Sequence, residues 1–267
     1  MAHAIVSPHR PTKIGTFRVS LRRATTAILF GSIVAAGGAV SPATAGTTKA
    51  VVELFTSQGC SSCPPADKLL AEYADRKDIL SLSFNVDYWD YLGWKDTLAS
   101  PENSQRQRNY ATARGDGQVY TPQAVIDGRT HVTGSNRDAI DAAIAANASN
   151  LSVPIELSSS SDAVTVNIGA APTPETPHAT LWLVMYDRSV SVPIERGENT
   201  GRTITYSNVV KKLRPIAMWK GEPMSVDLPK SEMTQAKAGR CAVLLQTEAA
   251  GGLPGPILGA ATINGPW

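Results

Sequence analysis

Apolar and polar positions along residues 49–148 alternate between strand-like runs and helical spacing. The run "KAVVELFTS" at residues 49–57 is rich in Val, Leu and Phe and predicts a strand. The run "CPPADKLLAEYADR" at residues 63–76 places its apolar residues at helical spacing, and its prolines fall in the first turn, where a missing N–H costs nothing. The pattern therefore predicts a strand that leads directly into a helix.

The same kind of pattern continues to about residue 148. The hairpin signal is Asp127-Gly128, a pair that favours the backbone of two-residue turns, and Asn136 is a typical helix N-cap. The predicted order is strand, helix, strand, helix, hairpin, helix. After the first strand and helix, these elements are a strand at 79–90, a helix-compatible polar stretch at 104–114, a hairpin at 121–135 and a helix from residue 137.

The pattern changes near residue 151. Short alternating apolar runs, separated by Pro, Gly and Ser, follow from there to the C-terminus and are typical of a small β-sandwich. We therefore predict an α/β domain at residues 46–150 and a smaller, mostly β, sandwich-like domain at residues 151–267.

The first 45 residues have the pattern of an export signal. They contain five Lys or Arg and no Asp or Glu, and their apolar run at 27–40 is short for a bilayer span. Cleavage is expected after Ala43-Thr44-Ala45, which predicts a periplasmic or secreted protein that meets the membrane only through the signal before cleavage; an uncleaved membrane anchor is the alternative. Cleavage would remove five positive charges from a formal net charge of +2, so no basic surface points to nucleic acid.

Composition bounds what the cysteines can do. A chain of 267 residues with 42% hydrophobic residues buries a core without disulfide staples, and three cysteines are too few for a disulfide framework. Two of them form Cys60-Ser61-Ser62-Cys63, where the predicted strand turns into the predicted helix. A redox dithiol, a metal clip and a structural disulfide are the three possible roles.

The position before a helix favours thiol chemistry. The N–H groups and the partial positive charge at a helix N-terminus stabilise a thiolate, which improves both attack and departure in disulfide exchange. We predict that Cys60 is the nucleophile and that Cys63, one turn along, resolves the mixed disulfide.

Other chemistries have less support in the sequence. Structural zinc wants four ligands and the chain has one CxxC pair, while His131 is interpreted as a surface or packing histidine, so no metal-binding residues are predicted. A cuprous ion needs fewer soft ligands, which leaves a copper-binding or delivery module open. Cys241 is interpreted as a buried thiol packed as a small hydrophobe. Since no nucleotide or dinucleotide fingerprint is present, no cofactor is expected.

Residues 50–148 resemble the thioredoxin superfamily. The strand before the dithiol, the CSSC that opens a helix, the Thr121-Pro122 that opens the hairpin and the terminal helix carry this resemblance. It implies a cis Pro122 that lies against the dithiol and forms the groove. It also implies that Glu53 is the buried carboxylate that helps to deprotonate the resolving cysteine, although strand alternation equally allows a surface-pointing Glu53. The expected fold is an α/β thioredoxin-like domain followed by the smaller β domain.

The chain is also similar to a family of exported bacterial thioredoxin-like proteins of unknown function. This similarity covers nearly the whole mature chain and implies no established substrate. It is carried by "ELFTSQGCSSCPPAD", "VDYWDYLGWKD", "VYTPQAVIDG" and "ERGENTGRTITYSNVV".

An aromatic cluster is a candidate substrate groove. Trp89, Tyr91 and Trp94, together with Thr121, are predicted to bind substrate beside the dithiol by stacking and hydrogen bonding. The alternative is that the rings cover an open edge of the core.

A Gly-rich turn in the β domain is a second candidate. Arg196, Glu198, Asn199 and Arg202 crowd this turn, and we hypothesise that it faces the dithiol. A solvated turn with internal charge pairing is the alternative.

These patterns together predict an exported thiol-disulfide oxidoreductase that acts through CSSC on protein or small-molecule thiols. Its partners would be thiol or disulfide client proteins. The alternatives are a copper-binding or delivery module and a redox-inert adaptor with a permanent disulfide.

Overall fold

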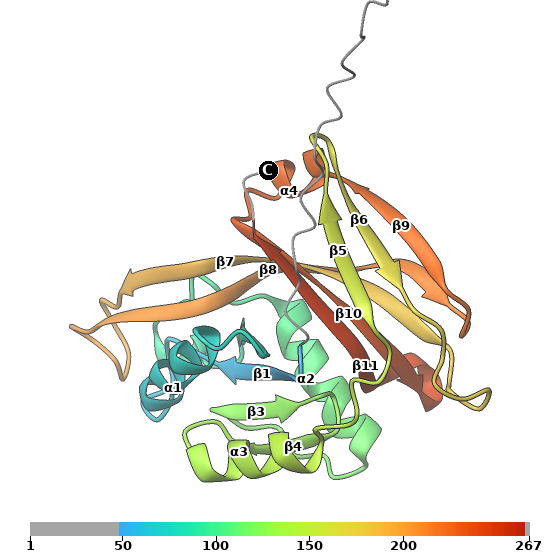
Figure 1. Cartoon of the computed structure of the whole chain (residues 1–267). Coiled ribbons are helices and arrows are strands. Elements are labelled where there is room, and N and C mark those ends of the chain that lie inside the picture. Colours follow the sequence, from blue (N-terminus) through green and yellow to red (C-terminus); the bar gives the residue numbers. More distant parts are fainter. Residues whose placement is uncertain (1–47, 265–267) are drawn as a thin grey trace, which may run out of the picture. The chain divides into compact units, whose positions relative to one another are not determined.

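The computed structural model of the chain describes residues 48–264 (Figure 1). All of them belong to one compact unit, and the predicted signal at residues 1–45 lies outside the described residues. None of the described helices is long and apolar enough to cross a membrane.

The chain alternates strands and helices in its first half and is mostly β in its second half. The helices are α1 (Pro64–Ala74), α2 (Pro101–Arg114), α3 (Arg137–Ala146) and the short α4 (Lys230–Gln235). The strands are β1 (Ala50–Thr56), β2 (Ile79–Asn85), β3 (Gln123–Ile126), β4 (Thr130–Thr133), β5 (Ile155–Ser159), β6 (Ala163–Ile168), β7 (Ala179–Pro193), β8 (Thr203–Trp219), β9 (Met224–Pro229), β10 (Arg240–Ala249) and β11 (Leu253–Asn264).

One mixed sheet of eight strands unites the two halves, in the order β11-β10-β7-β8-β2-β1-β3-β4. A second sheet holds β5, β6 and β9. The predicted fold, an α/β thioredoxin-like domain followed by a separate sandwich-like domain, is therefore wrong: the protein is mostly β, and strands from both predicted domains share one sheet. The division of the chain at residue 150 stays a prediction.

The two halves meet where β2 and β8 run parallel. Their register pairs Ser83 with Val209, and Asn208 reinforces the junction by donating to the carbonyl of Ser81 at 2.7 Å. Asn208 has a left-handed backbone with φ of 49°, which asparagine tolerates better than most residues. The junction depends on contacts between residues more than a hundred positions apart, which local patterns do not reveal.

The hydrophobic core lies on both faces of the large sheet. One cluster packs β1 and β2 together with β7 and β10, so it spans the two halves of the chain. On the other face, α1 and α3 cover β1 and β3, as alternating side chains on a strand require. A third cluster packs the small sheet against β7, β10 and β11.

Most local predictions in the first half are confirmed, but the strand predicted at residues 79–90 ends at Asn85, and a short 3-10 helix, η1 (Asp90–Leu92), follows it. Asp127 and Gly128 form the β3–β4 turn with φ of 52° and 66°, and the side chain of Asn136 caps α3 by accepting from the N–H of Ala139 at 3.1 Å. The polar stretch before residue 114 is helical and forms α2.

Candidate dithiol site

The two cysteines of CSSC form a disulfide in the turn between β1 and α1. Their Cα atoms are 5.4 Å apart, and Cys63 is the N-cap of α1, whose first residue is Pro64. Cys60 is 1% exposed and Cys63 is fully buried. The pair therefore lies at the positive end of a helix, as predicted, but is enclosed by other residues.

A network of short contacts fixes the turn before Cys60. The N–H of Gln58 donates to Asp96 Oδ2 at 2.8 Å, and the N–H of Gly59 donates to the hydroxyl of Ser57 at 3.1 Å. A Cβ at Gly59 would lie 3.0 Å from the Cβ of Trp89, which makes glycine the residue that fits best there. Buried Asp96 is thus part of the site.

Two of the predicted aromatic residues contact the site through their indole N–H groups. Trp94 donates to Gln58 Oε1 at 2.8 Å, and Trp89 donates to Thr121 Oγ1 at 2.8 Å. Tyr91 stacks on Trp89 with a centroid distance of 6.5 Å and is 79% exposed. The structure therefore brings Trp89, Trp94 and Thr121 to the dithiol turn and leaves Tyr91 in solvent. Their role in substrate binding stays a prediction.

The tip of the β7–β8 hairpin, residues 194–202, binds the backbone of the dithiol turn. Asn199 is fully buried, and its Nδ2 donates to the carbonyls of Gln58 and Cys60, each at 2.9 Å. A single side chain about 140 positions away thus holds the main chain at the predicted nucleophile.

Glu198 adds a negative charge to this contact. Its Oε2 accepts from the N–H of Ser61 at 3.2 Å, and Arg202 Nη1 donates to Asn199 Oδ1 at 3.1 Å. Arg196 is exposed. The Gly-rich turn therefore lies beside the dithiol, as the hypothesis from the sequence requires, and it does so through Glu198 and Asn199.

Glu53 is buried and does not contact the cysteines. Its Oε1 accepts from Arg106 Nε at 2.8 Å, and its Oε2 accepts from the hydroxyl of Tyr110 at 2.5 Å. Glu53 alternates with Val52, which packs under α1, so its side chain lies on the opposite face of the sheet from the helix of Cys63. The alternative prediction, a Glu53 that points to the surface, is therefore wrong. The role of Glu53 as a proton shuttle stays a prediction, and these contacts do not support it.

A different carboxyl group, that of Asp67, lies one helical turn after Cys63. It is buried, and neither carboxyl oxygen has a hydrogen-bond partner among residues 48–264. The hydroxyl oxygens of Thr56 and Tyr206 are also buried and have no hydrogen-bond partner among these residues. Burial raises the pKa of Asp67 to about 8, against a weaker lowering effect of Thr56, and nearby Asp96 raises it further. Burial, and then Asp67 and Asp96, raise the pKa of Tyr206. The sequence indicates this buried polar group only by placing an Asp at a core-facing position of a predicted helix.

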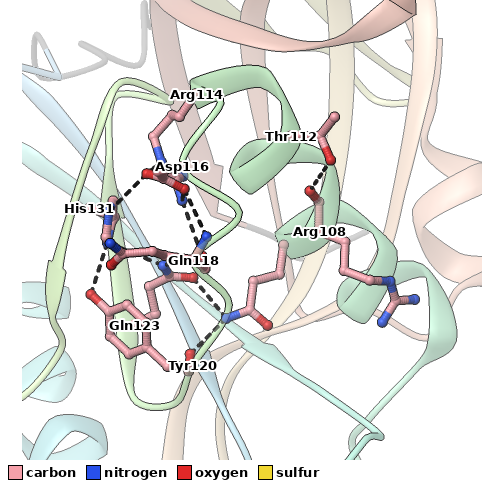
Figure 2. A network of polar contacts seen from close by, with 9 residues as sticks. Arg108, Thr112, Arg114, Asp116, Gln118, Tyr120, Gln123 and His131 are labelled. Carbon is pink, nitrogen blue, oxygen red and sulfur yellow. Dashed lines mark hydrogen bonds and ion pairs between the residues drawn. The ribbon is translucent and has the colours of Figure 1, made fainter.

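A polar network holds the segment between α2 and β3 (Figure 2). His131 Nε2 lies 3.2 Å from Asp116 Oδ2, while His131 Nδ1 lies 2.9 Å from the hydroxyl of Tyr120 and 3.2 Å from Gln123 Nε2. Burial, and then the charge of Arg114, lower the pKa of His131. Both ring nitrogens are engaged, so His131 is a packing histidine, as predicted.

The last candidates are Pro122 and Cys241. The Thr121–Pro122 peptide bond is cis, as the thioredoxin resemblance implies. Cys241 is 1% exposed and carries a free thiol whose pKa burial raises to about 12, which fits a small core residue. Within residues 48–264, no three His, Cys, Asp or Glu side chains are grouped so as to hold a metal ion.

Residues 51–246 match a family model described as "Protein of unknown function (DUF1223)". A protein from Agrobacterium tumefaciens, known from its crystal structure, has 41% sequence identity to this chain and a TM-score of 0.75. The match covers 83% of this chain and 96% of the Agrobacterium chain. HBP35 of Porphyromonas gingivalis is 10% identical with a TM-score of 0.56, covers 82% of this chain and 75% of that chain, and shows a similar fold alone. No curated protein matches.

Proposed function

We propose that this chain, which belongs to the DUF1223 family, is a thiol-disulfide oxidoreductase that uses Cys60 and Cys63 on protein or small-molecule thiols. The observation that carries the proposal is the disulfide across a two-residue spacer at the start of α1. There, the helix N-terminus would stabilise a thiolate in the reduced protein. The likeness to the thioredoxin superfamily supports the proposal through this local motif only. The oxidising compartment that such a pair needs is an exported location, which we also propose.

The reaction exchanges one disulfide for another. In the direction of client oxidation, a client thiolate attacks Cys60 Sγ, the Cys60–Cys63 bond breaks, and Cys63 leaves as a thiolate that takes up a proton. A second client thiolate then attacks the client sulfur of the mixed disulfide and releases the Cys60 thiolate. Two electrons pass from the client to the protein, and the reverse sequence reduces a client disulfide.

Enclosure of the disulfide restricts how this reaction begins. Because Cys60 is 1% exposed, an attacking thiolate reaches it only after neighbouring side chains move. The tip of the β7–β8 hairpin is the segment that binds Cys60 from outside the turn, through Asn199. Its displacement would uncover the nucleophile. The same enclosure favours the second candidate function, a redox-inert adaptor whose disulfide is permanent.

A redox titration distinguishes the two functions. The protein is equilibrated against glutathione buffers and read by thiol alkylation, and Cys63→Ala serves as a trap for mixed disulfides through Cys60. The oxidoreductase predicts a reversible transition between about −120 and −270 mV and trapped partners. Cys241→Ala is the matched control and is expected to leave the transition unchanged. A pair that stays oxidised below about −300 mV and traps nothing would leave the adaptor as the function.

A further inference from the structure

A cavity of about 580 Å³ lies between α2 and the strands β7, β8 and β10, away from the dithiol turn. Cavities of roughly 300–1,000 Å³ hold small organic ligands. Its apolar lining comes from Trp182 and Leu213 of the long hairpin and from Leu253 and Pro254, and Arg106 is among its polar lining residues. None of the dithiol residues lines it, so its occupant would be independent of the proposed thiol chemistry.

Arg106 keeps one edge of its guanidinium available. Its Nε donates to Glu53 at 2.8 Å, and its Nη2 donates to Tyr110 at 2.7 Å and to Gln246 at 3.0 Å. The side chain is only 8% exposed. Its Nη1 has no hydrogen-bond partner among the described residues, and this nitrogen is not fully buried. Since the side chain lines the cavity, the free Nη1 edge is available to a ligand there.

The guanidinium is also held rigidly. Its carbon lies 5.6 Å from the ring centroid of Phe84 and 4.9 Å from that of Tyr110, so the group is fixed by stacking as well as by hydrogen bonds. A donor that is already oriented and desolvated loses little entropy when it binds an acceptor. A carboxylate is the acceptor that best matches an arginine edge.

Charges near the cavity favour a ligand with a single negative charge. Lys212 lines the cavity and has no ion pair among the described residues, whereas Lys211 is bound by Asp187 at 3.3 Å. Glu102 and Glu248 line the cavity as well, and their carboxylates would oppose a second negative charge on a ligand. A monoanion is favoured over a dianion.

We propose that this cavity binds a small monocarboxylate with an apolar or aromatic body. The carboxylate accepts from Arg106 Nη1, with Lys212 nearby, and the body packs against Trp182, Leu213 and Leu253. The site takes a ligand class that is unrelated to thiols, and its existence does not depend on the dithiol reaction.

Calorimetric titration with three aromatic probes, two of which share the same body, tests the ligand class. We expect 4-phenylbutyrate to bind saturably with one site per chain. We expect 4-phenylbutanamide, which has the same body and no charge, to bind about tenfold more weakly or worse, because hydrogen bonds to charged groups are the stronger ones. Phenylsuccinate, the dianion, is expected to bind more weakly than the monoanion. Equal affinities for the acid and the amide, or no saturable binding of the acid, would overturn the proposal.

Variants locate the site. Replacement of Arg106 alone would leave Glu53 buried without its partner, so the double variant Glu53→Gln/Arg106→Gln removes both charges together. We expect it to remain folded, as judged by circular dichroism, and to lose the preference for acid over amide. Lys212→Met should reduce the same preference, while Lys220→Met, an exposed lysine outside the cavity, should not.

A variant of the apolar wall provides an independent check. Trp182 is half-buried, so Trp182→Ala should keep the fold. It should weaken the binding of 4-phenylbutyrate and the binding of its amide by similar factors. An unchanged affinity in Trp182→Ala, or an unchanged acid preference in the double variant, would place the binding elsewhere and refute the proposal.

Discussion

We expect Asp67 to make the stability of this protein fall as the pH rises through neutrality. The residue is buried in α1 without a hydrogen-bond partner for either oxygen among residues 48–264, and burial is the main reason that its pKa is raised to about 8. The ordinary value is 3.8. The folded protein therefore keeps this proton over a range in which the unfolded chain has lost it.

The sign and size follow from proton linkage. Because the folded pKa lies above the unfolded one, the stabilising effect is complete below pH 3.8 and is lost as the pH rises through 8. Between these values one proton is released on unfolding, so the free energy of unfolding falls by about 1.4 kcal/mol per pH unit from this group. The loss between pH 4 and pH 7 is on the order of 4 kcal/mol.

The isosteric variant Asp67→Asn isolates this effect. Urea unfolding of the oxidised protein at pH 5, 6, 7 and 8 gives the free energy of unfolding for each protein, and the difference between wild type and variant cancels other titrating groups such as Asp127, whose pKa burial raises to about 6. We expect the free energy of unfolding of the variant to increase relative to that of the wild type as the pH rises. Asp138→Asn, at an exposed position in α3, is the control and should show no such trend. Parallel pH profiles for wild type and Asp67→Asn would refute the protonated, buried carboxyl.

Three further predictions concern contacts described above. Asn199→Ala removes two hydrogen bonds to the dithiol turn, so we expect dithiothreitol to reduce the disulfide roughly ten- to hundredfold faster, whereas Thr200→Ala, an exposed neighbour, should match the wild type. An unchanged rate in the alanine variant would show that the hairpin tip does not control access. Arg106→Met leaves Glu53 buried without its ion pair and should cost about 3–5 kcal/mol in urea unfolding, much more than removal of both charges. Gly134→Ala would place a Cβ 2.5 Å from a leucine side chain of β1, and overpacking of this kind should cost about 1–3 kcal/mol; a loss near zero would contradict the close packing.

Local features of the first half could be predicted from the sequence because their causes are local. The Asp127-Gly128 turn, the Asn136 cap and the start of α1 depend on the conformations and hydrogen bonds of a few adjacent residues. The dithiol could be placed before a helix for the same reason. The type of each element therefore followed from periodicity and from turn and cap residues.

The arrangement of the sheet could not be predicted in this way. The pairing of β2 with β8 is specified by side chains far apart in the chain, and bulges in the β7–β8 hairpin interrupt alternation between Met185 and Tyr186. The sequence "SVPIERGENTGRTITY", which contains one proline and two glycines, also suggested separate short strands, while the structure has one long hairpin whose tip reaches Cys60. An alternating pattern indicates that a strand exists, but it does not indicate its partner.

Contacts between residues far apart in the sequence also decide which carboxyl group lies near the cysteines. Strand alternation left the face of Glu53 open, and the partner that fixes it, Arg106, comes from α2. Asp67 stands at a core-facing position of α1, but the polar groups that influence it, Tyr206 and Asp96, come from β8 and from the segment before α2. Buried polar groups of this kind are visible only when all the packed elements are known.

The contact between Asn199 and the Cys60 carbonyl has a consequence for biosynthesis. The chain is made from its N-terminus, so β1, the dithiol turn and α1 exist before residues 194–202 have been added. During that interval the cysteines have no hairpin tip beside them, and β2 has no β8 partner along its edge. Incomplete chains expose reactive and unpaired groups that the finished protein hides. An oxidant acting on the growing chain would therefore meet accessible thiols, and arrival of the last third of the sequence would end that period by enclosing the bond already made.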